Sequence, residues 1–311
     1  MSATAANKIA ITPRSLSEAG HSALSPLTEH GYELIYPAPG KTPSESDLIQ
    51  AMPGCVGWLA GVEPISAKVI QQASDLKVIS RNGVGVENID MDAARSRDIV
   101  IERALGANTR GVAELAISLM LDCFRSVAQS DAHLREGDWK RKIGIEAEGR
   151  VMGIVGCGAI GRCVAELALG LGMKVIAYDP YPLDGYAPER FCFASLEEVF
   201  SESQVISFHC PPGEKALVNQ QQVDNMRDGV YLINTARAEL LDDDAVLAGL
   251  ESGRIAALAT DVFHQEPPKP SALLSHANVI QTPHAGGYTV ESVEKATRQA
   301  VENILSVLEK V

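Results

Sequence analysis

Short runs of apolar residues alternate along the whole chain with segments whose apolar positions have helical spacing. A strand buried on both faces is a continuous apolar run, so this alternation predicts parallel sheets covered by helices. The strand-like runs are residues 9–11, 33–36, 55–59, 77–80, 100–102, 151–155, 174–178, 204–209, 230–234, 256–260 and 279–282. Helical patterns lie between most of them, for example at residues 44–52, 66–73 and 242–251.

The order of these elements predicts an α/β protein with two doubly wound parallel-sheet domains, and 311 residues suffice for roughly two domains. We expect a Rossmann NAD-binding domain at residues 105–283, inserted into a flavodoxin-like substrate-binding domain made of residues 1–104 and 284–311. The insertion requires the final helical stretch, residues 290–311, to return to the N-terminal half. Residues 109–135 form a long stretch that is more apolar than one exposed helix face needs, which makes it a candidate linker and subunit interface.

Residues 149–179 spell a complete nucleotide-binding βαβ unit. The apolar run 151–155 leads directly into G-x-G-x-x-G, formed by Gly156, Gly158 and Gly161, where a helix must begin. In such a unit the first glycine makes the tight turn, the second lets a pyrophosphate approach backbone N–H groups, and the third lets the helix pack closely on the strand. The surrounding strand, helix and second strand make this pattern specific for dinucleotide binding.

The second strand of the unit, residues 174–178, ends at Asp179, and Gly172 is placed to stop the helix before it. A carboxylate at this strand end accepts hydrogen bonds from ribose hydroxyls and repels a 2′-phosphate. No arginine follows in residues 180–182. The unit therefore favours NAD over NADP.

Composition and charge narrow the class of protein. The 46% hydrophobic and 22% charged residues are typical of a globular protein, and a net charge of −13 argues against nucleic acid or an anionic membrane as a partner. No segment has the length of a membrane span, and residues 1–12 lack the pattern of a leader, so we expect a cytoplasmic protein. The cysteines form no C-x-x-C pair, which predicts reduced, packed thiols and no metal site. They are Cys55, Cys123, Cys157, Cys163, Cys192 and Cys210.

Three loops that follow strands in the second half carry groups suited to oxidising an alcohol. Arg237 follows the strand at 230–234, Glu266 follows the next, and His284 follows the last. Active sites of doubly wound sheets lie at the carboxyl ends of strands. An imidazole can exchange the hydroxyl proton near neutral pH, a carboxylate favours its charged form, and a guanidinium binds an α-hydroxy carboxylate through forked hydrogen bonds.

Together these segments resemble the D-isomer-specific 2-hydroxyacid dehydrogenases over nearly the whole chain. Besides the glycine motif and Asp179, the matching segments are residues 80–90, 108–121, 233–250, 261–270 and 282–289. The resemblance implies NAD-dependent hydride transfer between nicotinamide and a small D-2-hydroxy acid or 2-keto acid, 3-phosphoglycerate-like or hydroxypyruvate-like. It also implies a homodimer.

Site roles carry over from this resemblance position by position. It implies that His284 is the catalytic acid/base, that Glu266 is its partner, and that Arg237 binds the substrate. It implies that the cofactor contacts Gly156, Gly158, Ala159, Ile160, Gly161, Asp179, Cys210, Pro211, Thr235, Ala236, Asp261 and Gly286. Of these, Ala159 and Ile160 would face the pyrophosphate, Cys210 and Pro211 the adenine side, and Asp261 the nicotinamide carboxamide. The implied substrate contacts are Arg81, Gly83, Val84, Gly85 and Arg237.

Several positions keep a second interpretation. Arg81 equally suits an ion pair with Glu87 or Asp90. Trp139 lies where relatives direct a tryptophan toward the partner subunit's active site, and packing in the core or an interface is its alternative. His209 and His264 are expected to be structural or exposed rather than catalytic.

The chain also departs from its relatives. The loop at residues 209–215 is shorter than usual and lacks threonines, and residues 57–61 hold no arginine where phosphoglycerate-specific relatives commonly carry one. A phosphorylated substrate therefore stays open, and no regulatory domain is expected after Val311. The rival functions are an NAD(H)-sensing, corepressor-like binding protein and a dehydrogenase of another substrate such as phosphite or formate. The full set of Arg237, Glu266 and His284 favours the hydroxyacid enzyme.

Overall fold

The computed structural model describes residues 7–18 and 20–310. Contacts divide these residues into two compact units. Unit 1 comprises the described residues up to Asn108 and those from Val290 onward, and unit 2 is Thr109–Thr289. Residues 1–6 and 311, which belong to the stretches inspected for a leader and for the final helix, lie outside the described residues.

The chain passes from unit 1 to unit 2 between Asn108 and Thr109 and returns between Thr289 and Val290. The sequence analysis placed these two boundaries after residues 104 and 283. The difference at the second boundary has a local cause. The backbone N–H groups of Ala285 and Gly286 donate hydrogen bonds to Asp261, so the segment that carries His284 is attached to unit 2.

Unit 1 is built on a five-stranded, fully parallel sheet in the order β2-β1-β3-β4-β5, which is the flavodoxin-like order. Its strands are β1 (Lys8–Ile11), β2 (Glu33–Ile35), β3 (Cys55–Ala60), β4 (Val78–Arg81) and β5 (Val100–Arg103). Its helices are α1 (Arg14–Ser17), η1 (Ser22–Leu24), α2 (Ser25–Glu29), α3 (Glu45–Ala51), α4 (Ala67–Gln72), α5 (Met91–Arg95) and α12 (Val290–Leu308).

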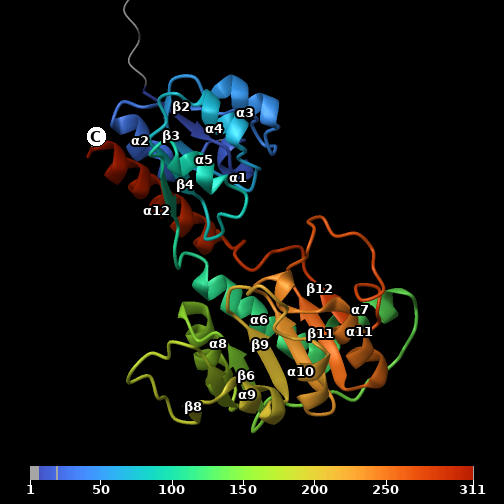
Figure 1. The fold of residues 1–311 in the computed structure, drawn as a ribbon. Helices are drawn as coiled ribbons and strands as arrows, with labels where there is room; N and C mark the ends of the chain where they lie inside the picture. Colours follow the sequence, from blue (N-terminus) through green and yellow to red (C-terminus); the bar gives the residue numbers. More distant parts are fainter. Residues whose placement is uncertain (1–6, 19, 311) are drawn as a thin grey trace, which may run out of the picture. The chain divides into compact units, whose positions relative to one another are not determined.

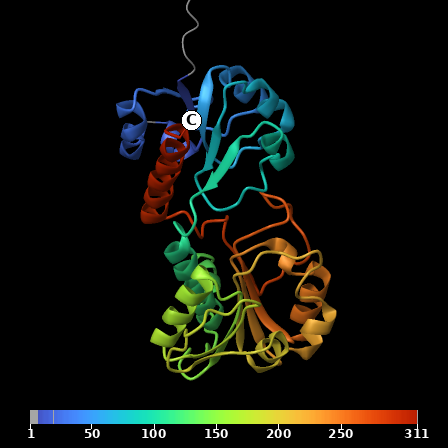
Figure 2. The same ribbon diagram turned by 60° about the vertical axis from the view of Figure 1, so that its left-hand side comes forward.

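The C-terminal helix α12 returns to the N-terminal half of the chain, as the inserted topology requires. Figures 1 and 2 show this red helix beside the blue and cyan elements of unit 1. Its residues Ala300, Val301 and Ile304 are buried in one apolar cluster with Ile9 and Ile11 of β1. The helix therefore completes the core of unit 1.

Unit 2 has a seven-stranded parallel sheet in the order β12-β11-β10-β9-β6-β7-β8, a Rossmann order with one further strand. Its strands are β6 (Val151–Val155), β7 (Lys174–Tyr178), β8 (Phe191–Phe193), β9 (Val205–Phe208), β10 (Val230–Asn234), β11 (Ile255–Thr260) and β12 (Val279–Gln281). Its helices are α6 (Thr109–Arg125), α7 (Val127–Arg135), α8 (Ala159–Gly170), α9 (Leu196–Glu202), α10 (Gln220–Asn225), η2 (Ala238–Leu240) and α11 (Asp243–Ser252). Figure 2 shows the green α6 and α8 on one side of this sheet and the orange helices on the other.

Two local features differ from the sequence expectation. The long apolar stretch 109–135 is divided into two helices, because Ser126 adopts a left-handed conformation with φ of 50° between α6 and α7. The apolar excess belongs to α6, which packs on α8, β10 and β11. The edge strand β8 was not expected, since a three-residue strand carries almost no periodic signal. No helix in the described part of the chain is long and apolar enough to cross a membrane.

Candidate active site

The glycine turn after β6 is constrained by the protein's own packing at two positions. Gly156 has φ of 93°, and a Cβ there would lie 2.6 Å from the carbonyl carbon of His209. A Cβ on Gly161 would lie 2.1 Å from the carbonyl oxygen of Gly156. Any side chain at either position therefore displaces backbone.

Gly158 differs from these two glycines, because a Cβ there would meet nothing within 4 Å. It caps the N-terminus of α8, and both Gly158 and Ala159 are exposed. Packing within the protein thus gives no reason for a glycine here, whereas close approach of a ligand does. Open space beside the N-terminus of a twelve-residue helix suits the anionic pyrophosphate of a dinucleotide.

A second observation also fits a bound cofactor. The hydroxyl oxygen of Thr235, directly after β10, is buried and has no hydrogen-bond partner among the described residues. A buried hydroxyl without a partner is costly, so a ligand group at this strand end would satisfy it. Gly158 and Thr235 therefore both suit a dinucleotide along the carboxyl edge of the sheet.

Asp179 lies at the end of β7, beside the glycine turn. Its Oδ2 accepts a hydrogen bond from the backbone N–H of Cys157 at 2.7 Å, and its Oδ1 accepts one from Tyr181 at 2.8 Å. These bonds orient the carboxylate and leave lone pairs for ribose hydroxyls. Cys210 is half-buried and Pro211 is exposed on the loop that follows β9, the strand on the other side of β6.

His284 and Glu266, which the sequence analysis pairs, are in direct contact. The Nδ1 atom of His284 lies 2.8 Å and 2.9 Å from the two carboxylate oxygens of Glu266. A carboxylate only accepts hydrogen bonds, so Nδ1 carries the proton and Nε2 is left for a substrate. The ring is half-exposed, and His284 has φ of 50°, a left-handed conformation that is uncommon for a non-glycine residue.

Asp261 organises the loop that carries His284. It is 1% exposed and accepts hydrogen bonds from the hydroxyl of Thr282 at 2.6 Å and from the N–H groups of Ala285 and Gly286, both at 2.8 Å. The two N–H donors directly follow His284 in the chain, so Asp261 holds the backbone from which the imidazole projects. Its expected contact with the nicotinamide carboxamide stays a prediction.

Arg237 projects from a turn shaped by Asn234, a residue that the sequence analysis did not single out. The buried Asn234 donates through Nδ2 to the carbonyl oxygen of Arg237 at 2.9 Å and accepts from the N–H of Ala236 at 3.1 Å. An asparagine between an apolar strand and a turn is the signal that would have identified it. Because β10, β11 and β12 are neighbours, the loops with Arg237, Glu266 and His284 leave the same edge of the sheet.

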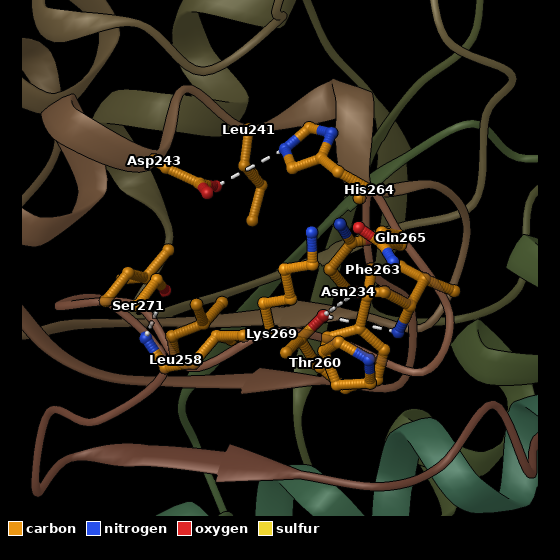
Figure 3. A pocket seen from close by; sticks show the side chains of 15 residues that line it. Asn234, Leu241, Asp243, Leu258, Thr260, Phe263, His264, Gln265, Lys269 and Ser271 are labelled. Carbon is orange, nitrogen blue, oxygen red and sulfur yellow. Dashed lines mark hydrogen bonds and ion pairs between the residues drawn. The ribbon is translucent and has the colours of Figure 1, made fainter.

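A small pocket of about 170 Å³ lies between η2, the start of α11 and the segment 262–274. Figure 3 shows Lys269 extending into it and His264 facing Asp243, with 3.5 Å between His264 Nε2 and Asp243 Oδ1. Small-molecule sites usually have volumes of about 300–1,000 Å³, so this pocket is too small for a dinucleotide. The glycine turn and the strand ends remain the predicted cofactor site.

The predicted substrate turn of unit 1 follows β4. Arg81 is half-buried, and a Cβ on Gly83 would lie 3.3 Å from its Nη1, so the guanidinium packs over this turn. Burial lowers the pKa of Arg81, while the charges of Glu63 and Glu87 raise it. Of the two ion-pair alternatives, Glu87 acts on Arg81 electrostatically, whereas Asp90 caps α5 by accepting from the N–H of Ala93. Val84 and Gly85 continue the turn and are half-buried.

The other residues that the sequence analysis singled out differ in their burial and contacts. His209 hydrogen-bonds Ser207 at 2.8 Å, and burial lowers its pKa to about 3, so it stays neutral at ordinary pH. Trp139 is 79% exposed, so its side chain does not pack in the core of this chain. All six cysteines are free thiols, although Cys192 is exposed rather than packed. Within the described residues, no three His, Cys, Asp or Glu side chains form a group that could hold a metal ion.

Comparison with known proteins identifies the family. The family model for the NAD-binding domain of D-isomer specific 2-hydroxyacid dehydrogenases matches residues 117–286. Hydroxypyruvate reductase of Thermotoga maritima is 38% identical over 251 residues, which cover 78% of this chain and 81% of that protein. D-3-phosphoglycerate dehydrogenase of Archaeoglobus fulgidus is 38% identical over 249 residues, which cover 78% of this chain and 47% of that longer protein. The solved TT0316 protein from Thermus thermophilus has a TM-score of 0.86 at 34% identity, with 97% of each chain covered.

The fold, the glycine turn after β6 and Asp179 at the end of β7 define an NAD-dependent oxidoreductase. The chain belongs to the D-isomer specific 2-hydroxyacid dehydrogenases. It spans about half the length of the D-3-phosphoglycerate dehydrogenase from Archaeoglobus fulgidus, so its own substrate has to be argued from its residues.

Proposed function

We propose that this enzyme interconverts a small 2-keto acid and the corresponding D-2-hydroxy acid, hydroxypyruvate-like or 3-phosphoglycerate-like, with NAD as cofactor. The observation that carries the proposal is the contact between His284 Nδ1 and the Glu266 carboxylate, which leaves Nε2 for the substrate. Arg237 on the loop after β10 supplies a cation at the same sheet edge. The relatives named hydroxypyruvate reductase and D-3-phosphoglycerate dehydrogenase support this substrate class.

In this proposal each residue of the site has one task. Bound NADH supplies the hydride that reduces the keto carbon. His284 donates the proton on Nε2 to the substrate oxygen, and Nδ1 keeps its proton and its hydrogen bond to Glu266. The Glu266 carboxylate stabilises the imidazolium form before the transfer. The guanidinium of Arg237 orients the substrate through its carboxylate and carbonyl oxygens.

Unit 1 would bind the substrate through the turn after β4. The backbone at Gly83, Val84 and Gly85 would receive the carboxylate, and Arg81 would supply the positive charge. The hydrogen bond from Ala104 N to the carbonyl oxygen of Gly83 at 2.9 Å keeps the turn in place. Residues up to Asn108 and from Val290 therefore form the proposed substrate-binding domain.

A panel of 2-keto acids tests the function. We expect NADH oxidation at neutral pH with at least one of hydroxypyruvate, glyoxylate, phosphohydroxypyruvate, pyruvate and bulkier 2-keto acids, and much slower oxidation of NADPH. Turnover of none of them, with NADH still bound, would contradict the proposal. It would then favour an NAD(H)-sensing binding protein, or a dehydrogenase of phosphite or formate, which the same assay examines in the oxidative direction.

Replacing Asp179 by alanine is expected to narrow the preference for NAD over NADP. The carboxylate oxygens that face Cys157 and Tyr181 in the native protein would no longer repel a 2′-phosphate or bind ribose hydroxyls. The ratio of kcat/KM for NADH and NADPH measures the change, which we expect to be at least about tenfold because a hydrogen bond to a charged group contributes about 1.5–3 kcal/mol. An unmutated enzyme that used both cofactors equally would contradict the assignment.

We further propose a cytoplasmic homodimer. Exposed apolar side chains gather along residues 127–143 of unit 2, where Val127 is 60%, Leu134 54%, Trp139 79% and Ile143 98% exposed. An apolar surface of this kind suits a second copy of the chain. The unpaired state of all six cysteines fits a reducing compartment.

A further inference from the structure

Unit 1 buries an acidic residue that neither the family resemblance nor the proposed mechanism uses. Glu63 is 1% exposed and lies shortly after β3, in the segment that contains Gly61. A Cβ on Gly61 would lie 2.6 Å from Glu63 Oε2. The carboxylate is therefore folded over Gly61 and occupies the space of a side chain at that position.

The hydrogen bonds around Glu63 favour its charged form. Glu63 Oε1 accepts from the N–H of Gly61 at 3.0 Å and contacts the hydroxyl of Thr12. That hydroxyl oxygen itself accepts from Trp58 Nε1 at 3.0 Å and from Gly61 N at 3.1 Å, and its one proton is shared between Glu63 Oε1 and the carbonyl oxygen of Leu59 at 3.2 Å. Burial is the largest influence and raises the pKa of Glu63 above its ordinary value, and these hydrogen bonds and the charge of Arg81 offset part of that rise.

The segment with Glu63 is tied to both sides of the predicted substrate turn. Before the turn, the N–H of Asn82 donates to the carbonyl oxygen of Ala60 at 2.9 Å. After the turn, Asn88 Nδ2 donates to the carbonyl oxygen of Glu63 at 2.6 Å and to that of Gly61 at 3.4 Å. The backbone of this segment is thus tied to Asn82 and Asn88, which flank the turn, and the charge of the Glu63 carboxylate acts on Arg81.

The charges around this turn suit a substrate with a single anionic group. Arg81 is the only lysine or arginine in the two segments 57–66 and 81–90. The negative charges of Glu63 and Glu87 both act on it. A phosphate adds about 1.5 to 2 negative charges at neutral pH, and charges in a poorly solvated site interact more strongly than in water.

Two buried atoms at the end of β4 point to the same substrate class. Arg81 Nε, a donor, and Asn82 Oδ1, an acceptor, have no hydrogen-bond partner among the described residues. A hydroxyl group can both donate and accept, whereas a phosphate dianion can only accept. A neutral substituent with a hydroxyl group can therefore hydrogen-bond both Arg81 Nε and Asn82 Oδ1, whereas a phosphate dianion can hydrogen-bond only Arg81 Nε.

We propose that Glu63 is a specificity-determining residue: its buried carboxylate, in the segment that is hydrogen-bonded to both sides of the turn, makes residues 83–85 select 2-keto and 2-hydroxy acids with uncharged polar substituents against phosphorylated ones. This inference rests on the proposed function, because it assumes that the turn binds the substrate. It narrows that function to the hydroxypyruvate-like side.

Steady-state kinetics with hydroxypyruvate and phosphohydroxypyruvate, which differ by the phosphoryl group alone, test this inference. The native enzyme should have a kcat/KM at least about tenfold higher for hydroxypyruvate, from the charge repulsion alone. In Glu63→Gln, which keeps the shape and removes the charge, the ratio should move toward phosphohydroxypyruvate by about tenfold. The matched control is Glu33→Gln, since Glu33 is exposed at the start of β2 and changes the net charge equally; it should leave the ratio unchanged.

The outcomes separate this inference from the function on which it rests. A native enzyme that prefers phosphohydroxypyruvate overturns the role of Glu63, even if Glu63→Gln fails to fold. The same holds for a ratio that moves equally in Glu63→Gln and Glu33→Gln, or in neither. Turnover of no 2-keto acid overturns the proposed function first, and the substrate selection with it.

Discussion

Replacing His284 by alanine is expected to lower kcat by roughly 10²–10⁴-fold, the range that general acid/base catalysis contributes. In the proposed mechanism the imidazole offers Nε2 to the substrate, while Nδ1 lies 2.8 Å and 2.9 Å from the Glu266 carboxylate oxygens. NADH affinity should survive, because the glycine turn and Asp179 lie in other parts of unit 2. Stopped-flow or steady-state turnover, together with NADH fluorescence titration, separates the two effects.

His264→Ala is the matched control for this experiment. His264 lies on the loop before Glu266, and its Nε2 lies 3.5 Å from the Asp243 carboxylate, so the variant loses an imidazole from the same region without touching the acid/base pair. We expect it to keep turnover within a few-fold of the native enzyme. Equal losses in both variants, or unchanged turnover in His284→Ala, would remove His284 from the mechanism.

The second large effect is expected from a pair of glycine variants. In Gly158→Ala the added methyl meets no protein atom within 4 Å, so the fold should be kept while the pyrophosphate is pushed away from the N-terminus of α8. Loss of one hydrogen bond to a charged group corresponds to about 1.5–3 kcal/mol, or roughly 10–150-fold weaker NADH binding. In Gly161→Ala the methyl would lie 2.1 Å from the carbonyl oxygen of Gly156, so α8 must move off β6.

Thermal unfolding and NADH titration of both variants distinguish these effects. Gly158→Ala should keep the native Tm and lose NADH affinity, whereas Gly161→Ala should have a lower Tm as well. A Gly158→Ala protein that binds NADH as tightly as the native one would show that the cofactor does not approach this turn. A Gly161→Ala protein of native stability would contradict the close packing of α8 on β6.

Much of unit 2 was predictable because its signals are local. The strands at 151–155, 174–178 and 230–234 have the bounds that the apolar runs predict, and Gly172, with φ of 82°, follows the end of α8 as a stop. A buried parallel strand must be apolar throughout, and a left-handed helix end prefers glycine, so both constraints are written in neighbouring residues. The three-residue edge strand β8 had no such signal.

The supporting residues of the site were harder to predict, because their partners are distant in the chain. Asp261 could be expected to lie near a strand end, but its role as acceptor for Thr282, Ala285 and Gly286 depends on β11 and β12 being neighbours. Glu63 appeared in the sequence as an ordinary loop carboxylate. Its hydrogen-bond partner Thr12 directly follows β1, and Arg81, whose charge acts on it, ends β4, so no short-range pattern joins them.

By itself, the sequence determined the two parallel-sheet domains and the glycine turn followed by a strand that ends at Asp179, because these depend on residue type and short spacing. It also predicted the set of Arg237, Glu266 and His284 as the catalytic residues. Only the tertiary structure decided which ring nitrogen of His284 is left for the substrate, how Asp261 holds its loop, and where the Glu63 carboxylate lies. The physical reason is that hydrogen bonds and buried charges act through space. They join residues that only the packing of distant strands brings within reach.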